Sequence, residues 1–351
     1  MNKKIKIGNR IISQDSPAFV IAELSCNHKN NFDIAIKTID AIHAAGADCV
    51  KLQTFKPGSI TIDSKKEDFI IKGGTLWDEK SLFELYMEVY TPWEWHSDLK
   101  EYVEDKGMVF FSSPFDNEAV DFLTELNVPA YKIASFEITD IPLIEYTASK
   151  LKPIIISTGI ATKEDIQEAV MACKRMGNDQ LILLKCTSSY PTPLTDVNLN
   201  LIPQIASDFD CLVGLSDHTE GSLVPLGAVS LGARVIEKHF ILDRSLGGPD
   251  SAFSMEPIEF KKMVDDIRNL EKAFGISDYV LSEKVINNKQ FSRSVYVVKD
   301  VKKGELISPE NIRSIRPGHG MHPKYFSSVL GKVFKYDIAK GTRFDKNLIE
   351  E

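Results

Sequence analysis

The stretch CLVGLSDHTEGSLVPLGAVSLGARVIEKHF, residues Cys211–Phe240, shows in short form how the whole chain is built. An apolar run, Cys211–Leu215, is followed by an amphipathic segment, Gly221–Leu231, and by a second apolar run, Arg234–Phe240. Runs that are nearly continuous in apolar character, rather than alternating, are typical of parallel strands buried on both faces. The stretch therefore predicts a strand–helix–strand unit of a parallel sheet.

The same pattern extends toward the N-terminus. Further apolar runs rich in β-branched residues are Phe19–Leu24, Asp48–Gln53, Met108–Ser112, Ala130–Ile133, Ile154–Ser157 and Leu181–Cys186. The amphipathic segments between them include Asp33–Ala45, Trp93–Lys106, Asn117–Leu126 and Lys163–Met176. Eight strand–helix units over about 250 residues fit a (β/α)8 TIM barrel. A doubly wound open sheet is the alternative, because periodicity does not distinguish a closed sheet from an open one.

The connection after the second predicted strand, Thr54–Glu79, is unusually long and contains a charged run, Lys65–Asp68, and the pair Gly73–Gly74. Long loops in compact domains are usually functional lids or disordered segments. On a barrel this loop would leave from the C-terminal face, where active sites are built.

The apolar pattern changes after residue 272. We predict a barrel domain over residues 1–272, a polar linker over 273–290 and a small β-rich domain over 291–351. The last segment contains a short internal repeat, since Asp300-Val-Lys-Lys-Gly304 resembles Asp337-Ile-Ala-Lys-Gly341. This indicates a pseudo-symmetric domain, too small to bury much surface unless it docks on something else.

The composition excludes several classes of protein. The chain has 351 residues, of which 43% are hydrophobic and 26% charged, as in an ordinary soluble globular protein. A net charge of -8 without a long basic run argues against a nucleic-acid partner. The five cysteines show no CxxC spacing, which predicts reduced thiols in a cytoplasmic protein. No apolar stretch suggests a signal peptide or a membrane helix.

Two histidines are candidate metal ligands. His218 and His239 each end a predicted strand, and these strands are consecutive in the barrel. Adjacent strands lie about 5 Å apart, so both imidazoles could reach one ion. The alternative is two unrelated histidines, one in the core and one on the surface.

Lysines lie inside apolar strands, where burial is costly without an anionic partner. These lysines are Lys51, Lys132 and Lys185, and hydroxyl side chains follow at the same strand ends: Ser135, Ser157, Thr158, Thr187, Ser188 and Ser216. Such a ring of donors suits a phosphate and a carboxylate. The alternative, a lysine aimed at solvent from a strand end, is favoured for Lys185 only.

Carboxylates also follow the strands: Glu23 the first, Glu137 the fourth, and Asp217 beside His218. A carboxylate near a metal-bound water is a candidate general base. The alternative is a helix cap or a supporting partner of another side chain, and we favour it for Asp217 but not for Glu23 or Glu137.

Taken in order along nearly the whole chain, these motifs resemble the sialic acid synthase family. The matching stretches are Ala22–His28, Val50–Thr54, Tyr131–Ser135, Ile156–Gly159, Cys186–Pro193, Gly214–His218, Glu237–His239, Gly248–Asp250 and Arg316–Gly318. The C-terminal segment is similar to the antifreeze-like (SAF) domain of that family, with the loop Arg316-Pro-Gly-His-Gly320.

Within the family, the segment Lys66–Gly74 with Leu76-Trp-Asp78 is similar to pseudaminic acid synthases. Ser188 stands where N-acetylneuraminate synthases carry asparagine, and Ser112-Ser-Pro-Phe115 also departs from their pattern. The resemblance thus implies condensation of phosphoenolpyruvate with 2,4-diacetamido-2,4,6-trideoxy-L-altrose and water, giving pseudaminic acid and phosphate. The product would serve flagellin glycosylation or a surface polysaccharide. N-acetylneuraminate and legionaminic acid synthesis are the alternatives.

The resemblance also implies a role for each matching residue. A divalent ion, Mn²⁺ or Mg²⁺, would be bound by His218 and His239, with Glu137 orienting or deprotonating a metal-bound water and Glu23 assisting. Phosphoenolpyruvate would be held by Lys51, Lys132, Ser157 and Ser216, with Ser135 and Ser188 nearby. The aminosugar would contact Gln53, Tyr190 and Asp250. Arg316 would reach the sugar from a second subunit, which implies a domain-swapped homodimer.

Two other functions compete with this interpretation. One is a metal-dependent aldolase, or another phosphoenolpyruvate-condensing synthase, on the same barrel. The other is a carbohydrate-binding protein that has lost its chemistry. The intact set of His218, His239, Lys51, Lys132 and Glu137 argues against the second.

Overall fold

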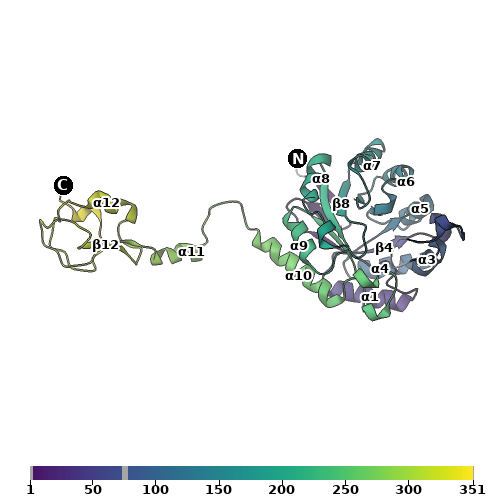
Figure 1. Cartoon of the computed structure of the whole chain (residues 1–351), viewed down its shortest axis with the longest axis horizontal. Coiled ribbons are helices and arrows are strands. Elements are labelled where there is room, and N and C mark those ends of the chain that lie inside the picture. The colour runs from purple at the N-terminus through teal and green to yellow at the C-terminus, as the bar shows by residue number, and fades with distance from the viewer. Residues whose placement is uncertain (1–2, 73–77, 351) are drawn as a thin grey trace. The chain divides into compact units, whose positions relative to one another are not determined.

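The computed structural model describes residues 3–72 and 78–350. The chain divides into two compact units, Met1–Gly275 and Ile276–Glu351, which are described separately below (Figure 1). The glycine pair Gly73–Gly74 and the Leu76-Trp77 part of the motif named above lie outside the described residues.

The first unit is a closed barrel of eight parallel strands, in the order β10-β3-β4-β5-β6-β7-β8-β9. The strands are β3 (Phe19–Glu23), β4 (Cys49–Thr54), β5 (Val109–Pro114), β6 (Tyr131–Ile133), β7 (Ile154–Ser157), β8 (Leu181–Cys186), β9 (Leu212–Asp217) and β10 (Val235–His239). This confirms the predicted TIM barrel and excludes the open sheet. Pairing of β10 with β3 closes the ring and sets His239 beside Glu23, while β3 sets Glu23 beside Lys51.

Helices surround the strands of this unit (Figure 1). They are α1 (Phe32–Ala44), α4 (His96–Asp105), α5 (Asn117–Glu125), α6 (Ile141–Ala148), α7 (Lys163–Arg175), α8 (Leu201–Phe209), α9 (Leu223–Ser230) and α10 (Pro257–Ala273). Several begin at a side chain that accepts an N-terminal backbone N–H, such as Asn31 before α1, Asp116 before α5 and Thr162 before α7. These caps fix the residues at which the helices begin.

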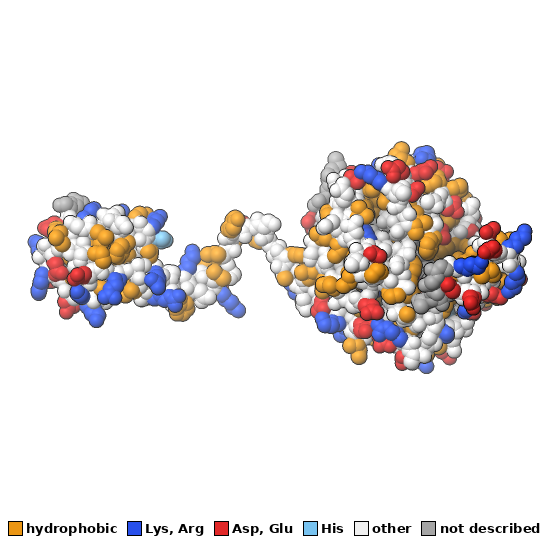
Figure 2. Space-filling model, in the orientation of Figure 1, with side chains coloured by type: hydrophobic (Ala, Val, Ile, Leu, Met, Phe, Trp, Pro, Cys, Tyr) orange, Lys and Arg blue, Asp and Glu red, His pale blue; other side chains and the backbone are white. Residues whose placement is uncertain are grey.

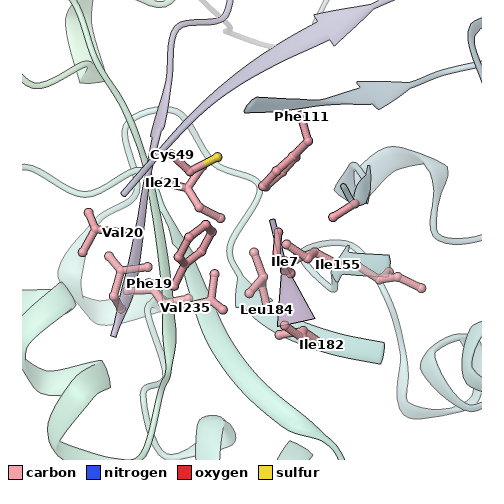
Figure 3. Close-up of a cluster of buried hydrophobic side chains, with 14 of the residues drawn as sticks. Ile7, Phe19, Val20, Ile21, Cys49, Phe111, Ile155, Ile182, Leu184 and Val235 are labelled. Atoms are coloured by element: carbon pink, nitrogen blue, oxygen red, sulfur yellow. The ribbon is translucent and has the colours of Figure 1, made fainter. Parts of the chain in front are cut away.

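The barrel interior is filled by large apolar side chains (Figure 3), among them Phe19, Phe111 and Leu184. An N-terminal hairpin, β1 (Lys4–Ile7) and β2 (Arg10–Ser13), adds two antiparallel strands to those predicted from the sequence. Its Ile7 is fully buried in the same cluster. Its turn residue Gly8, with φ +57°, lies against Val109, the first residue of β5. The hairpin therefore covers the N-terminal end of the barrel, opposite the strand ends that carry the polar residues.

The long connection after β4 is folded over much of its described length. It contains α2 (Pro57–Ile60), a 3-10 turn at Glu67–Phe69 and α3 (Leu82–Val89). The backbone of Ile71 exchanges hydrogen bonds with Glu79 and Lys80. α3 begins at Ser81, which forms a capping box with Glu84. The connection thus places a helix of its own beside the C-terminal face of the barrel.

The second unit has its own apolar core, built around Val295, Val297, Phe334 and Phe344. Its elements include α11 (Glu283–Asn288), β11 (Ser294–Val297), β12 (Ile312–Ile315) and α12 (Phe326–Val329), with β11 and β12 antiparallel. Among the described residues, no helix is both long and apolar enough to cross a bilayer.

The two copies of the repeated motif in the second unit contact each other reciprocally. The Asp300 carboxylate accepts the backbone N–H of Lys340 at 2.7 Å, and the Asp337 carboxylate accepts that of Lys303 at 2.8 Å. An antiparallel bridge joins Val301 to Ile338 between them. Each copy of the motif therefore closes the turn of the other, which is the pseudo-symmetry that the sequence indicates.

Candidate active site

A cavity of about 480 Å³ opens at the C-terminal face of the barrel, between the strand ends and the connection after β4. Most of the residues singled out from the sequence line it: Glu23, Lys51, Gln53, Lys132, Ser135, Glu137, Ser157, Tyr190, Ser216, His218, His239 and Asp250. Ser188 is not part of the lining, but its Oγ lies 2.8 Å from that of Ser135. Arg316 belongs to the second unit and lies in the loop after β12.

The two histidines lie side by side. Their ring centroids are 5.3 Å apart, with the ring planes at 53°. Phe253 packs edge-on against the His239 ring at 5.0 Å, and Tyr190 lies 4.4 Å from the His218 ring. His218 Nδ1 is 3.3 Å from the carbonyl oxygen of Thr187, a contact that leaves Nε2 for a ligand.

Carboxylates flank His239 on both sides. Its Nε2 lies 3.3 Å from Glu23 Oε2, and its Nδ1 lies 3.4 Å from Asp250 Oδ2. The second contact lacks the geometry of a hydrogen bond, so Nδ1 is buried without a hydrogen-bond partner. Burial opposes the charged imidazole, but the two carboxylates outweigh it and raise the pKa of His239. Burial, with His239 adding to it, lowers the pKa of His218 to about 3, so that His218 is neutral.

These imidazoles fit a divalent ion held by few protein ligands. Among residues 3–72 and 78–350, no group of three or more His, Cys, Asp or Glu side chains is arranged to hold a metal. Two neighbouring imidazoles, one of them neutral and one with an unpartnered buried nitrogen, are a donor set that leaves coordination positions for water and substrate.

The floor of the cavity contains two buried lysines paired with buried glutamates. Lys51 and Lys132 are each 2% exposed. Lys51 Nζ lies 2.6 Å from Glu23 Oε1 and 3.7 Å from Glu237 Oε2, whereas Lys132 Nζ lies 3.5 Å from Glu237 Oε1. Burial opposes the charge of both amines. The carboxylates outweigh burial and raise the pKa of Lys51, but burial prevails at Lys132 and lowers its pKa.

Glu237 is a site residue that is not predicted from the sequence, and the same holds for Ser25 and Phe253, which also line the cavity. Glu237 lies on β10 between the two lysines, accepts a 2.9 Å hydrogen bond from Ser216 Oγ, and leaves its own Oε2 without a hydrogen-bond partner. The signal was present, because a glutamate inside the apolar strand Val235–His239 needs a partner as much as a strand lysine does. Buried lysines on β4 and β6 therefore imply a buried acid near them.

Lys185 and Asp217 lie outside the cavity lining. The expectation that Lys185 points to solvent is wrong, since it is 4% exposed and donates to the Thr187 hydroxyl. Asp217 pairs with Lys238 Nζ at 2.5 Å and accepts the N–H of Thr219, which is the supporting role favoured above. This buried pair fixes the start of the loop after β9.

The remaining acids differ in charge state. Burial raises the pKa of Glu137 to about 7, against the opposing charge of Lys132, and its Oε2 has no hydrogen-bond partner. Burial would also raise the pKa of Glu23, but Lys51 and His239 hold it well below its ordinary value. Gln53 Nε2 donates to Glu23 Oε1 at 2.8 Å. The site thus combines a fixed carboxylate with one that titrates near neutrality, the pattern of acid–base chemistry.

Hydroxyl groups complete the lysine side of the cavity. Ser157 Oγ is buried without a hydrogen-bond partner, and the Ser135 and Ser188 hydroxyls contact each other. A Cβ added at Gly159 would lie 2.2 Å from Ser188 Oγ and 2.6 Å from Ser135 Oγ. Glycine at 159 is therefore required for these two serines to meet.

Comparison with known proteins identifies the two units. The model of the NeuB family matches residues 38–279, and that of the SAF domain matches residues 292–350. A curated pseudaminic acid synthase of Campylobacter jejuni is 49% identical over 337 residues, covering 96% of this chain and 97% of the relative. The pseudaminic acid synthase of Helicobacter pylori is 46% identical over 335 residues, covering 95% and 98%. A crystal structure of N-acetylneuraminic acid synthetase from Leptospira borgpetersenii superimposes with a TM-score of 0.73 at 31% identity, covering 82% of this chain and 95% of that one.

Proposed function

Because the chain belongs to the NeuB family, we propose that it catalyses the pseudaminic acid synthase reaction. In this reaction phosphoenolpyruvate condenses with 2,4-diacetamido-2,4,6-trideoxy-L-altrose and water to give pseudaminic acid and phosphate. Identity of 46–49% over nearly the full length to two such synthases supports the choice of sugar. The observation that carries the chemistry is one cavity in which two imidazoles adjoin two buried lysines.

Phosphoenolpyruvate binds on the lysine side. Its phosphate and carboxylate are met by Lys51, Lys132, Ser157 and Ser216, with Ser135 and Ser188 close by. Buried ammonium groups and a hydroxyl that lacks a partner are preorganised donors for anions. Glu237 holds the two lysines in the absence of substrate.

His218 and His239 would hold a divalent ion, Mn²⁺ or Mg²⁺, which would supply Lewis-acid polarisation of the sugar aldehyde. Glu23 orients His239 from one side and Asp250 from the other. Loss of activity on chelation, restored by Mn²⁺ or Mg²⁺, is the expected sign of this site.

The reaction joins carbon 3 of phosphoenolpyruvate to the aldehyde carbon of the open-chain sugar, and the electron pair of the enol double bond forms the new bond. Carbon 2 becomes electron-deficient and water adds to it, with its proton passing to Glu137 and from there to the alkoxide that the aldehyde oxygen has become. The tetrahedral carbon then expels phosphate by C–O cleavage, which leaves the 2-keto acid. A carboxyl that titrates near pH 7 suits this proton transfer.

The sugar lies against Gln53, Tyr190 and Asp250, and Arg316 reaches it from the second unit of a partner chain in a domain-swapped homodimer. All five cysteines are free buried thiols, which supports a reducing, cytoplasmic compartment.

The test is product analysis. Purified protein is incubated with phosphoenolpyruvate and a panel of 2-acetamido and 2,4-diacetamido hexoses, and the products are identified by mass spectrometry alongside phosphate release. We expect phosphate release that requires both substrates and is fastest with 2,4-diacetamido-2,4,6-trideoxy-L-altrose. Preference for N-acetylmannosamine or for the legionaminic precursor would assign the chain to one of the alternative activities.

A further inference from the structure

The helix α3 turns an apolar stripe toward the cavity. Leu82, Leu85, Tyr86 and Val89 recur at the spacing of one helical face and all line the cavity. We call these four residues the α3 face. Such a stripe normally packs into a core, yet only Leu85 is buried here, while the other three are partly exposed. The α3 face is therefore a wall of the cavity rather than part of a core.

The opposite side of α3 is charged. Glu84 pairs with Lys65 and Glu88 with Lys80, both at 2.6 Å. Figure 2 shows charged side chains gathered at the edge of the barrel unit where α3 lies in Figure 1. Because the polar side of the helix faces solvent, the α3 face is held toward the cavity.

Neighbouring side chains extend this wall. Ile60 and Ile71, from the same connection, also line the cavity, as do Phe55 and Phe115. Phe55 packs edge-on against Tyr86 at 5.7 Å and against Phe115 at 5.3 Å. The cavity therefore has two unlike parts, a charged floor at the strand ends and an apolar wall above it.

The proposed reaction determines which end of the sugar faces the floor of the cavity and which end faces the wall. The aldehyde carbon must approach the lysines and histidines, since the new bond forms there. The C6 end of the open chain then extends away from the floor, toward the connection after β4. On a 6-deoxy sugar that end is a methyl group, and on an ordinary hexose it is a hydroxymethyl group.

We propose that the α3 face is the surface that selects acceptors with a methyl group at C6 against those with a hydroxymethyl group, an inference that rests on the proposed function. A methyl group gains from contact with this wall. A hydroxyl placed there loses water and finds in the α3 face only the Tyr86 hydroxyl as a hydrogen-bonding side chain. An apolar pocket rejects an added hydroxyl by about 100-fold at most, which sets the expected preference at roughly 10- to 100-fold in kcat/KM.

The experiment compares two acceptors of the same configuration that differ only at C6, using phosphate release with saturating phosphoenolpyruvate. Val89→Thr replaces a methyl group of the wall by a hydroxyl with little change of shape. Leu82→Asn places a polar group at the other end of the α3 face. Each variant should lower the preference for the 6-deoxy acceptor about tenfold. The KM for phosphoenolpyruvate should stay within about twofold of wild type, since neither residue lies on the floor.

Ile62→Thr is the matched control, because Ile62 belongs to the same connection, is 59% exposed and does not line the cavity. It should leave the preference unchanged, and Val89→Ile should retain it. Equal losses for both acceptors in Val89→Thr and Leu82→Asn, or a wild-type preference near unity, would overturn the inference. Wild-type protein that releases no phosphate with either acceptor would instead overturn the proposed function.

Discussion

Glu23 and His239 end neighbouring strands of the barrel, in register, with Glu23 Oε2 3.3 Å from His239 Nε2. The other oxygen of the same carboxylate lies 2.6 Å from Lys51 Nζ. One side chain therefore joins the imidazole half of the cavity to the lysine half. Because the pairing of β10 with β3 closes the barrel, closure of the fold and assembly of the site are one event.

Replacing His239 tests the metal proposal. His239→Ala should leave the fold intact, because His239 is the last residue of its strand, lines the cavity, and makes no hydrogen bond through Nδ1. Turnover should fall below detection, since the ion would lose one of its two protein ligands. Circular dichroism and phosphate release over a Mn²⁺ titration check this. Full activity of the variant at saturating metal would refute the assignment.

Replacing Glu237 tests the lysine side of the cavity. Glu237→Gln keeps the shape but removes the carboxylate near Lys51 and Lys132, so we expect the KM for phosphoenolpyruvate to rise by about tenfold or more and the KM for the sugar to change little. Glu237→Ala should also destabilise the fold by about 3–5 kcal/mol, the cost of leaving buried charge uncompensated. Steady-state kinetics and denaturant unfolding measure the two effects. Unchanged phosphoenolpyruvate kinetics in Glu237→Gln would show that the carboxylate has no part in binding.

The titration of Glu137 predicts a pH dependence. Burial raises its pKa to about 7, so the carboxylate form, which the proposed mechanism uses as proton acceptor, appears only as the pH rises through neutrality. The rate should therefore increase with pH on an acidic limb centred near 7. Glu137→Gln should lower kcat by roughly 100- to 10,000-fold and remove that limb. A pH–rate profile of wild type and variant shows whether Glu137 is the group that titrates on the acidic limb. An acidic limb that survives in the variant would assign the proton transfer to another group.

The swapped dimer has a direct test by mixing. Arg316→Ala should raise the KM for the sugar more than that for phosphoenolpyruvate. If Arg316 acts on the partner chain, a mixture of the His239→Ala and Arg316→Ala proteins, unfolded and refolded together, should recover activity at a low sugar concentration. Roughly a quarter of the sites should be intact, because half the dimers would be mixed and each would hold one intact site. No recovery above the separate variants, or equal losses for both substrates in Arg316→Ala, would exclude the swapped arrangement.

Much of this architecture can be predicted from the sequence. Continuous apolar runs indicated all eight barrel strands, and β7 and β8 have the predicted bounds, Ile154–Ser157 and Leu181–Cys186. The reason is that a strand buried on both faces leaves an uninterrupted apolar signal. Polar residues that end such runs then lie together at the C-terminal end of the barrel, and this placement predicts that His218 and His239 are neighbours.

Other features required the tertiary structure. The hairpin Lys4–Ser13 is too short for its pattern to show what it covers, and closure of the ring depends on the distant partners β3 and β10. The identity of the partners of Glu237 also required it, because Lys51 and Lys132 are far away in sequence.

The α3 face shows the same division between what the sequence determines and what the tertiary structure determines. Its spacing shows from the sequence alone that Leu82, Leu85, Tyr86 and Val89 share one side of a helix. Only the folded chain shows that this side borders an open cavity and not a core. Local periodicity indicates which side chains of a helix form its apolar side. The surface that this side faces depends on contacts between segments distant in sequence.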